Sequence, residues 1–180
     1  MPTPSPAPFT DSARLARAES LIALTPDFPQ PGILFRDIGP MLTDADALAA
    51  VTQALAAPFE GGFDLVAGVE ARGFLLAGTV AATTRTGLLP IRKAGKTPRP
   101  SASVDYALEY GIATIEAAGD LTGRRVLLVD DVLATGGTLR AAVSLVEQLG
   151  GTVAGVAVVL ELTELGGRAA VPSTHAVFAT

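Results

Sequence analysis

The stretch Val126-Leu-Leu-Val-Asp-Asp-Val-Leu-Ala-Thr-Gly-Gly-Thr138 decides the fold class of this chain. Its first part, residues 125–129 when Arg125 is included, is a near-continuous apolar run. Such runs are found in central parallel strands that are covered on both faces. Two carboxylates and a short glycine loop follow, and residues 139–149 predict a helix that stops at Gly150 and Gly151. A strand that passes through a tight loop into a helix is typical of an α/β fold with a parallel sheet.

The same alternation of strands and helices continues on both sides of this stretch. Strands are predicted at residues 63–69, 88–91, 125–129 and 153–162. Helices are predicted at residues 11–24, 44–57, 73–84 and 139–149, irregular structure at residues 25–32 and 94–104, and a hairpin or arm at residues 106–117. We therefore expect an α/β fold with a mostly parallel central sheet flanked by helices and a flexible arm. One domain is expected over residues 11–180, after a disordered, Pro-rich N-terminus at residues 1–10.

The composition of the 180-residue chain narrows the chemistry that it can perform. Hydrophobic residues make up 49%, which excludes a disordered protein, yet no run reaches the ~18 apolar residues of a membrane span. The absence of Cys excludes disulfides, thiolate zinc sites and a Cys nucleophile, and a single His, His175, argues against a His-based triad. The net charge of −5 argues against binding nucleic acid through a broad basic face. We expect a soluble, cytoplasmic protein with no membrane or nucleic-acid partner.

The loop after the buried strand has the features of a phosphate site. Adjacent glycines let the backbone turn closely around a ligand, while the Thr hydroxyls and a helix N-terminus supply donors and partial positive charge. These residues are Ala134, Thr135, Gly136, Gly137 and Thr138. Asp130 and Asp131 precede the loop and suit the vicinal hydroxyls of a ribose, or a magnesium ion. Acidic N-capping residues are the alternative, but capping explains one Asp and not two followed by TGGT.

This stretch resembles the phosphoribosyl-pyrophosphate motif of type I phosphoribosyltransferases. Five further segments, in order and at similar spacing, resemble the adenine phosphoribosyltransferase family, so that the likeness covers about residues 11–170. They are Phe28–Ile38, Gly68–Phe74, Ile91–Lys96, Ala107–Gly111 and Leu160–Leu165. The resemblance implies a glycosyltransferase of purine salvage that converts adenine and 5-phosphoribosyl 1-pyrophosphate into AMP and pyrophosphate. It also implies a magnesium cofactor, held mainly by the substrate with no dedicated protein ligand, and a homodimer.

The resemblance also assigns roles to single residues. Residues 134–138 hold the 5-phosphate, and Asp130 and Asp131 hold the ribose hydroxyls. The pyrophosphate site comprises Glu70, Ala71, Arg72, Gly73, Arg92, Lys93 and Lys96. The adenine site comprises Leu34, Phe35 and Arg36, with Phe35 stacked on the purine. Catalytic roles go to Glu109, Arg72 and Lys93, with Glu109 handling the proton, and the closing arm carries Tyr106 and Tyr110.

Several of these residues also have purely structural explanations. Glu70 and Arg72 can be surface charges that flank a helix start, Phe35 can belong to the core, as we expect for Phe28, and Glu109 can be a solvated charge on a hairpin. His175 is expected to be an incidental residue at a strand end.

Other functions remain as alternatives to adenine transfer. A 6-oxopurine is one alternative acceptor, but those enzymes generally place an acidic residue or a Lys beyond the phosphate loop, and no Lys follows Lys96. A nucleic-acid-binding regulator of the same fold would need an added domain or a basic face. A phosphoribosyl-binding module without activity would not need the acidic pair, the pyrophosphate loop and the arm together.

Overall fold

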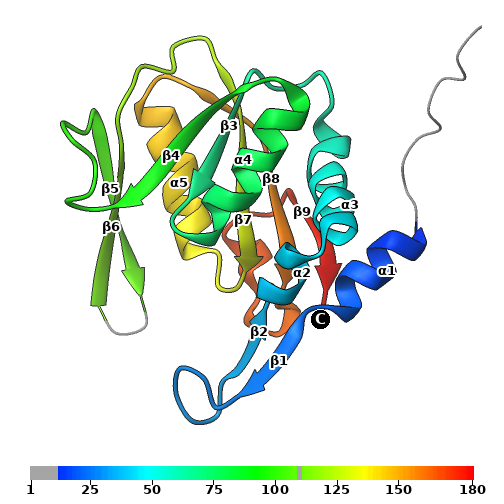
Figure 1. The fold of residues 1–180 in the computed structure, drawn as a ribbon. Coiled ribbons are helices and arrows are strands. Elements are labelled where there is room, and N and C mark those ends of the chain that lie inside the picture. The colour runs from blue at the N-terminus through cyan, green and yellow to red at the C-terminus, as the bar shows by residue number, and fades with distance from the viewer. Residues whose placement is uncertain (1–11, 109–110) are drawn as a thin grey trace, which may run out of the picture. The chain divides into compact units, whose positions relative to one another are not determined.

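The computed structural model describes residues 12–108 and 111–180 of the chain (Figure 1). The chain divides into two compact units, Met1–Ala54 and Leu55–Thr180. Residues 1–10, for which disorder is expected, lie outside the described residues, and the single domain over residues 11–180 stays a prediction.

Within the described residues, the larger unit contains a seven-stranded sheet with the strand order β5-β6-β4-β3-β7-β8-β9. Its strands are β3 (Leu65–Val69), β4 (Gly87–Lys93), β5 (Ala102–Leu108), β6 (Gly111–Ala117), β7 (Arg125–Leu133), β8 (Thr152–Glu161) and β9 (Thr174–Ala179). The strands from β4 to β9 in this order pair in parallel, whereas β6 pairs antiparallel with both β4 and β5. The mostly parallel sheet and the hairpin that forms its edge are confirmed.

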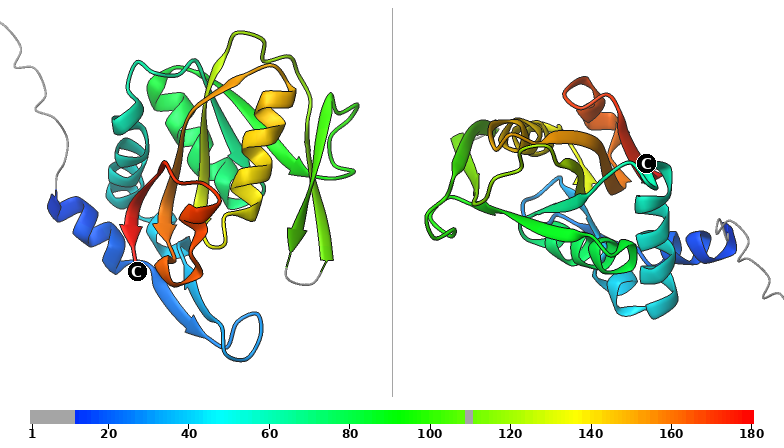
Figure 2. Two further views of the ribbon diagram at one scale, coloured as in Figure 1. Left: turned by 180° about the vertical axis from the view of Figure 1, so that it is seen from behind. Right: turned by 90° about the horizontal axis from the view of Figure 1, so that it is seen from above.

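Helices cover both faces of this sheet. Figures 1 and 2 show α4 (Arg72–Thr84) on one face and α5 (Gly137–Gln148) on the other. The apolar side of α4 packs against β3, β4 and β7, and α5 packs against β5 to β8. Because β7 lies between the two layers, its side chains at 126–129 are fully buried, as the apolar run predicts. Three short 3-10 helices complete the unit: η1 (Ala57–Phe59), η2 (Thr163–Leu165) and η3 (Gly167–Ala169).

The order of the strands determines where a ligand can bind. The loops β3–α4 and β7–α5 both leave the carboxyl ends of strands, and β3 pairs directly with β7 and with β4. In an open parallel sheet, ligands bind outside the carboxyl ends of neighbouring strands. Phosphoribosyl pyrophosphate is predicted to bind three segments: the β3–α4 loop, the β7–α5 loop and residues 92–96 at the end of β4. All three therefore start from adjacent strands.

The smaller unit consists of α1 (Ser12–Ser20), β1 (Ala23–Pro26), β2 (Leu34–Asp37), α2 (Gly39–Thr43) and the beginning of α3 (Ala45–Ala56). The helix predicted to begin near residue 44 is confirmed, and Asp44 caps it, since an Asp44 carboxylate oxygen accepts the Ala47 N–H at 2.9 Å. The prediction of a helix to residue 24 is wrong, because α1 ends at Ser20 and residues 23–26 pair antiparallel with β2. Pro26 is tolerated at the end of β1, where a strand needs no further N–H donor.

Long-range pairing also extends two strands, β5 and β7, beyond their predictions and adds a further strand, β9. β5 begins at Ala102, inside the segment predicted to be irregular, because its backbone pairs with β6 as far as Ala117. β7 continues past the apolar run to Leu133 in register with β8, so both Asp130 and Asp131 lie within the strand. β9 was not predicted, and it forms by parallel pairing with β8. None of the helices within residues 12–108 and 111–180 combines the length and apolar character that crossing a bilayer requires.

Candidate active site

The phosphate loop, residues 134–138, connects β7 to α5 and packs closely against residues 167–170. Gly136 has a φ of 81°, in the left-handed region that favours glycine, and it is the residue that caps α5. A Cβ at Gly136 would lie 2.6 Å from the carbonyl oxygen of Gly167 and 2.9 Å from the Cβ of Ala170. The η3 segment therefore fixes the position of the loop by packing against Gly136. The first N–H groups of α5 remain available to an anion.

The acidic pair lies beside this loop and is almost fully buried. Asp130 and Asp131 are each 8% exposed, and the Asp131 N–H donates to Asp130 Oδ1 at 2.8 Å. Arg72 reaches the pair from the start of α4, with its Nε 3.0 Å from Asp131 Oδ2. Burial, and then the neighbouring charge of Asp131, raise the pKa of Asp130 well above its ordinary value.

A glycine in α4 leaves room for the acidic pair. A Cβ at Gly73 would lie 2.8 Å from Asp130 Oδ1 and 3.0 Å from the Val129 carbonyl oxygen. Gly73 thus contributes to the predicted pyrophosphate loop by its lack of a side chain, because any larger residue would displace Asp130.

Glu70, in the β3–α4 loop, forms an ion pair with the basic turn of residues 93–97 that follows β4. Its Oε1 lies 2.6 Å from Lys96 Nζ, and its Oε2 accepts the backbone N–H of Lys93 at 3.0 Å. These two bonds, that of Lys96 first, lower the pKa of Glu70 below its ordinary value. The bond between Glu70 and Ala71 is cis. The Arg92 guanidinium donates to the Lys96 carbonyl oxygen, so Arg92 also supports the turn.

A cleft of about 800 Å³ joins these elements within the larger unit. Its walls include the acidic pair, the whole phosphate loop, residues 70–72 and Lys93. Among the described residues, Gly73, Arg92 and Lys96 are not part of this lining, so only four of the seven predicted pyrophosphate residues line the cleft directly. Carboxylates, backbone amides and cations face one space that is suited to a phosphorylated sugar.

The closing arm corresponds to the hairpin of β5 and β6. Tyr106 lines the cleft, and a Cβ at Gly137 would lie 3.8 Å from its ring and 3.6 Å from the Ala107 carbonyl oxygen, so the arm lies close to the phosphate loop. Glu109 and Tyr110 lie outside the described residues, and their predicted roles stay predictions.

The predicted adenine-binding residues lie on β2 in the smaller unit. Leu34 is 43% exposed, and the ring of Phe35 meets the ring of Phe28 edge to face, with centroids 5.0 Å apart. The expectation that Phe28 belongs to the core is wrong, because Phe28 is 50% exposed. The physical reason is that Phe28 lies in the loop of residues 27–33 between β1 and β2, where an Asp27 carboxylate oxygen accepts the Gly32 N–H at 2.7 Å and the Phe28 N–H donates to the Ile33 carbonyl oxygen at 3.3 Å.

Comparison with known proteins places these features in a family. Residues 37–178 match the family model of the phosphoribosyl transferase domain. The chain is 60% identical over 153 residues to the adenine phosphoribosyltransferase of Arthrobacter sp. (strain FB24), covering 84% of this chain and 83% of that protein. It is 58% identical over 162 residues to the enzyme of that name from Saccharopolyspora erythraea, covering 89% and 88%.

Solved structures agree with this likeness. The adenine phosphoribosyltransferase of Rhodothermus marinus superposes with a TM-score of 0.89 at 41% identity, covering 94% of this chain and 100% of that one. The Giardia lamblia enzyme complexed with 9-deazaadenine gives a TM-score of 0.87 at 37% identity, covering 92% and 97%. The chain belongs to the adenine phosphoribosyltransferase family. The predictions of a phosphoribosyltransferase enzyme and of the family's α/β fold are confirmed.

The structure also shows residues around the site that sequence reasoning missed. Gly167 packs under the phosphate loop so closely that a Cβ there would lie 2.3 Å from the Ala134 carbonyl oxygen. Arg168 anchors the same segment, with its Nη2 2.6 Å from Glu161 Oε2 and its Nη1 2.8 Å from the Thr174 carbonyl oxygen. Glu116 is a third missed residue, buried on β6. A carboxylate within an apolar strand was the available signal for both Glu116 and Glu161.

His175 plays no part in this arrangement. It lies on β9, and its ring meets the ring of Phe59 edge to face at a centroid distance of 6.3 Å.

Proposed function

We propose that this chain transfers the 5-phosphoribosyl group from 5-phosphoribosyl 1-pyrophosphate to a ring nitrogen of adenine, producing AMP and pyrophosphate in purine salvage. The bond from the ribosyl carbon to pyrophosphate breaks, the bond to the adenine nitrogen forms, and that nitrogen loses its proton. The observation that carries the proposal is the shared cleft, in which the phosphate loop, the acidic pair, Arg72 and Lys93 face one space.

The ribose phosphate occupies the half of the cleft between β7 and α5. The backbone N–H groups of residues 136–138 and the hydroxyls of Thr135 and Thr138 bind the 5-phosphate at the helix N-terminus. Asp130 and Asp131 accept hydrogen bonds from the ribose hydroxyls. Because positive charge develops on the ribosyl carbon as the pyrophosphate departs, the same carboxylates stabilise the transition state.

The leaving pyrophosphate occupies the half of the cleft formed by residues 70–72 and the basic turn. Arg72 and Lys93 neutralise the negative charge that develops on the leaving oxygen, which stabilises the transition state more than the ground state. Substrate binding requires Arg72 to exchange its contact with Asp131 for the pyrophosphate. Lys96 and Arg92 add positive charge beside the same phosphates, while Glu70 holds the turn through the Lys96 ammonium group and the Lys93 N–H.

The purine stacks on Phe35, and backbone groups of Leu34 and Arg36 contact its edge. Glu109 accepts the proton that adenine loses, since the chain offers a single His and that residue lies on β9. Tyr106 and Tyr110 close over the substrates and exclude water. The structure of the relative with 9-deazaadenine, an adenine analogue, supports adenine as the acceptor.

Magnesium fits the donor set of this site. Within the part of the chain that the structure describes, no cluster of three acidic or His side chains occurs, and the cleft offers the oxygens of two neighbouring Asp residues. Magnesium commonly takes one or two carboxylates and completes its shell with substrate oxygens and water. When bound, magnesium would neutralise charge on the pyrophosphate. Asp130 and Asp131 would hold the ribose hydroxyls and so help to place the substrate oxygens that bind the metal. We further propose a cytoplasmic homodimer without membrane or nucleic-acid partners. The family resemblance implies the homodimer, and the net charge of −5 argues against a nucleic-acid partner.

The test is nucleotide synthesis by the purified protein with magnesium, the pyrophosphate donor and one purine base at a time. AMP should form with adenine, and no nucleotide should form with hypoxanthine or guanine. Nucleotide formation with a 6-oxopurine would redirect the proposal to another base, and no product with any base would remove the proposed activity.

A further inference from the structure

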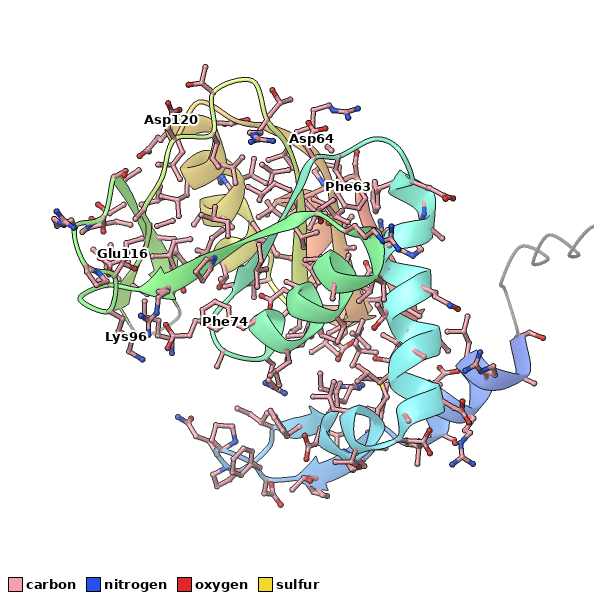
Figure 3. The ribbon with its side chains drawn as sticks, turned by 45° about the horizontal axis from the view of Figure 1, so that its top comes forward. Phe63, Asp64, Phe74, Lys96, Glu116 and Asp120 are labelled. Atoms are coloured by element: carbon pink, nitrogen blue, oxygen red, sulfur yellow. The ribbon has the colours of Figure 1, made fainter. Side chains whose placement is uncertain are left out.

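The basic turn of residues 93–97 carries both lysines of the chain, Lys93 and Lys96. It follows β4, and carboxylates from two other elements accept hydrogen bonds from it. Glu70 comes from the β3–α4 loop, and Glu116 comes from β6, the antiparallel neighbour of β4. Figure 3 shows Glu116 and Lys96 on the same side of the larger unit.

Glu116 holds the backbone of this turn. A single oxygen, Oε1, accepts the Lys96 N–H at 2.9 Å and the Thr97 N–H at 2.7 Å. The Ala94 N–H donates to the Thr114 carbonyl oxygen at 3.0 Å, so β6 supports the turn at both of its ends. Glu116 is only 5% exposed, and a carboxylate so buried needs such donors. The N–H groups, that of Thr97 first, lower the pKa of Glu116 below its ordinary value.

Glu70 holds the same turn from the cleft side. Its two oxygens bind the Lys93 N–H and the Lys96 ammonium group, and Glu70 itself lines the cleft. Lys96 is thus fixed at two points: its N–H by Glu116 and its ammonium by Glu70. Lys93 lines the cleft, and the bond from its N–H to Glu70 fixes the backbone from which its side chain extends.

We propose that Glu116 is a positioning residue for the leaving group, which sets the shape of the turn so that Lys93 and Lys96 meet pyrophosphate. This inference rests on the proposed role of these lysines in pyrophosphate binding. Glu116 is not among the cleft-lining residues within the described chain, and it acts through the turn. A negative charge near a polyanion site opposes binding, so its contribution lies in geometry, and a neutral side chain with the same acceptor oxygen should replace it.

The substitutions that test this proposal are Glu116→Ala, Glu116→Met and Glu116→Gln. Calorimetry with magnesium present would give the dissociation constants of inorganic pyrophosphate and of AMP, and steady-state assays would give KM for the donor and kcat. Ala and Met should each weaken pyrophosphate about tenfold and raise the donor KM similarly, because small displacements of a binding group cost this much. AMP affinity should change less than about twofold, and Gln should restore pyrophosphate binding because its carbonyl oxygen replaces Oε1.

Asp120→Ala is the matched control. Asp120 also holds a turn by accepting a backbone N–H, that of Thr122 at 2.9 Å, but its turn carries no site residue and lies well apart from Lys96 in Figure 3. This variant should bind pyrophosphate and AMP as the native protein does.

Three outcomes would overturn the role of Glu116. These are native pyrophosphate affinity in a folded Ala or Met variant, equal losses for pyrophosphate and AMP, and failure of all variants but Gln to fold, which would make the residue structural. Lys93→Ala separates this inference from the proposed function. If Lys93→Ala leaves pyrophosphate binding unchanged, the proposed role of the turn is wrong, whereas a loss with Lys93→Ala but none with Glu116→Ala refutes only the inference.

Discussion

In the proposed complex with the donor, the phosphate loop and the basic turn hold the two ends of one substrate by opposite means. The phosphate loop contains no cation, and it binds through backbone N–H groups whose directions are fixed by glycine conformation and by close packing on Gly167. The basic turn carries long cationic side chains, and the carboxylates of Glu116 and Glu70 bind it at the Lys96 N–H and ammonium groups. We therefore expect phosphate binding by the backbone of the loop to be lost when atoms are added to it. Binding by the lysine side chains of the turn should instead be lost when their charge, or the carboxylates that bind the turn, are removed.

The largest effect is expected from one added methyl group in the phosphate loop. Gly136→Ala should reduce kcat/KM for the donor by about 10³-fold or more, because the Cβ would meet the Gly167 carbonyl oxygen at 2.6 Å and alanine disfavours a φ of 81°. Steady-state kinetics would measure the loss. Gly78→Ala is the control: Gly78 lies in α4 with no atom within 4 Å of an added Cβ, so its activity should be native. Native activity in Gly136→Ala would show that the phosphate loop tolerates an added Cβ.

Substitution in the acidic pair should lower activity and raise stability at the same time. Asp130→Asn should lower kcat/KM about 100-fold, because it removes a negative charge beside the ribosyl carbon. The same substitution should raise Tm by about 2–4 °C at neutral pH. Kinetics and thermal unfolding of both proteins in the absence of substrate would measure the two effects.

The pH dependence of this stabilisation follows from the raised pKa of Asp130. The protonated carboxyl contributes its stability fully below the unfolded pKa of about 3.9, and this contribution is lost as the pH rises through the higher folded pKa. The difference in Tm between Asp130→Asn and the native protein should therefore be absent in acid and grow towards neutrality. A difference that is constant from acid to neutral pH would contradict the assignment.

Removal of charge from the basic turn should have a moderate effect. Lys93→Ala should raise the KM for the donor about tenfold, because one charge-assisted contact with pyrophosphate is lost while the turn keeps its carboxylate anchors. Raised salt should weaken the native protein more than this variant, since salt screens exposed charges. Donor KM values at two ionic strengths would measure both effects, and equal salt dependence would argue that Lys93 does not contact the donor.

The smallest effect is expected from the only His of the chain. His175→Ala should keep native kcat and KM, because the ring packs on Phe59 and lies outside the cleft lining within the described residues. A small drop in Tm, of about 1–3 °C, should reflect the lost ring contact. Loss of activity in a folded His175→Ala variant would count against the assignment of proton handling to Glu109.

Prediction from the sequence succeeded where the determining contacts are local. The passage from β7 through Gly136 into α5 depends on neighbouring residues, and Asp44 caps α3 three residues away. It failed where an element depends on a distant partner. Residues 23–26 form a strand through pairing with residues 34–37, and β9 is defined only by its pairing with β8. Their own periodicity does not determine these structures.

The sequence by itself determined the α/β class, the phosphate loop, the acidic pair and the family. All of these reside in contiguous motifs whose backbone geometry follows from glycine, from apolar runs and from helix ends. Only the tertiary structure decided how the ends of the site are supported. Glu116 reaches the turn 19 and 20 residues away, and Gly167 fits beneath Gly136. The physical reason is that a buried carboxylate finds its donors, and a glycine its neighbour, only after separate strands have paired.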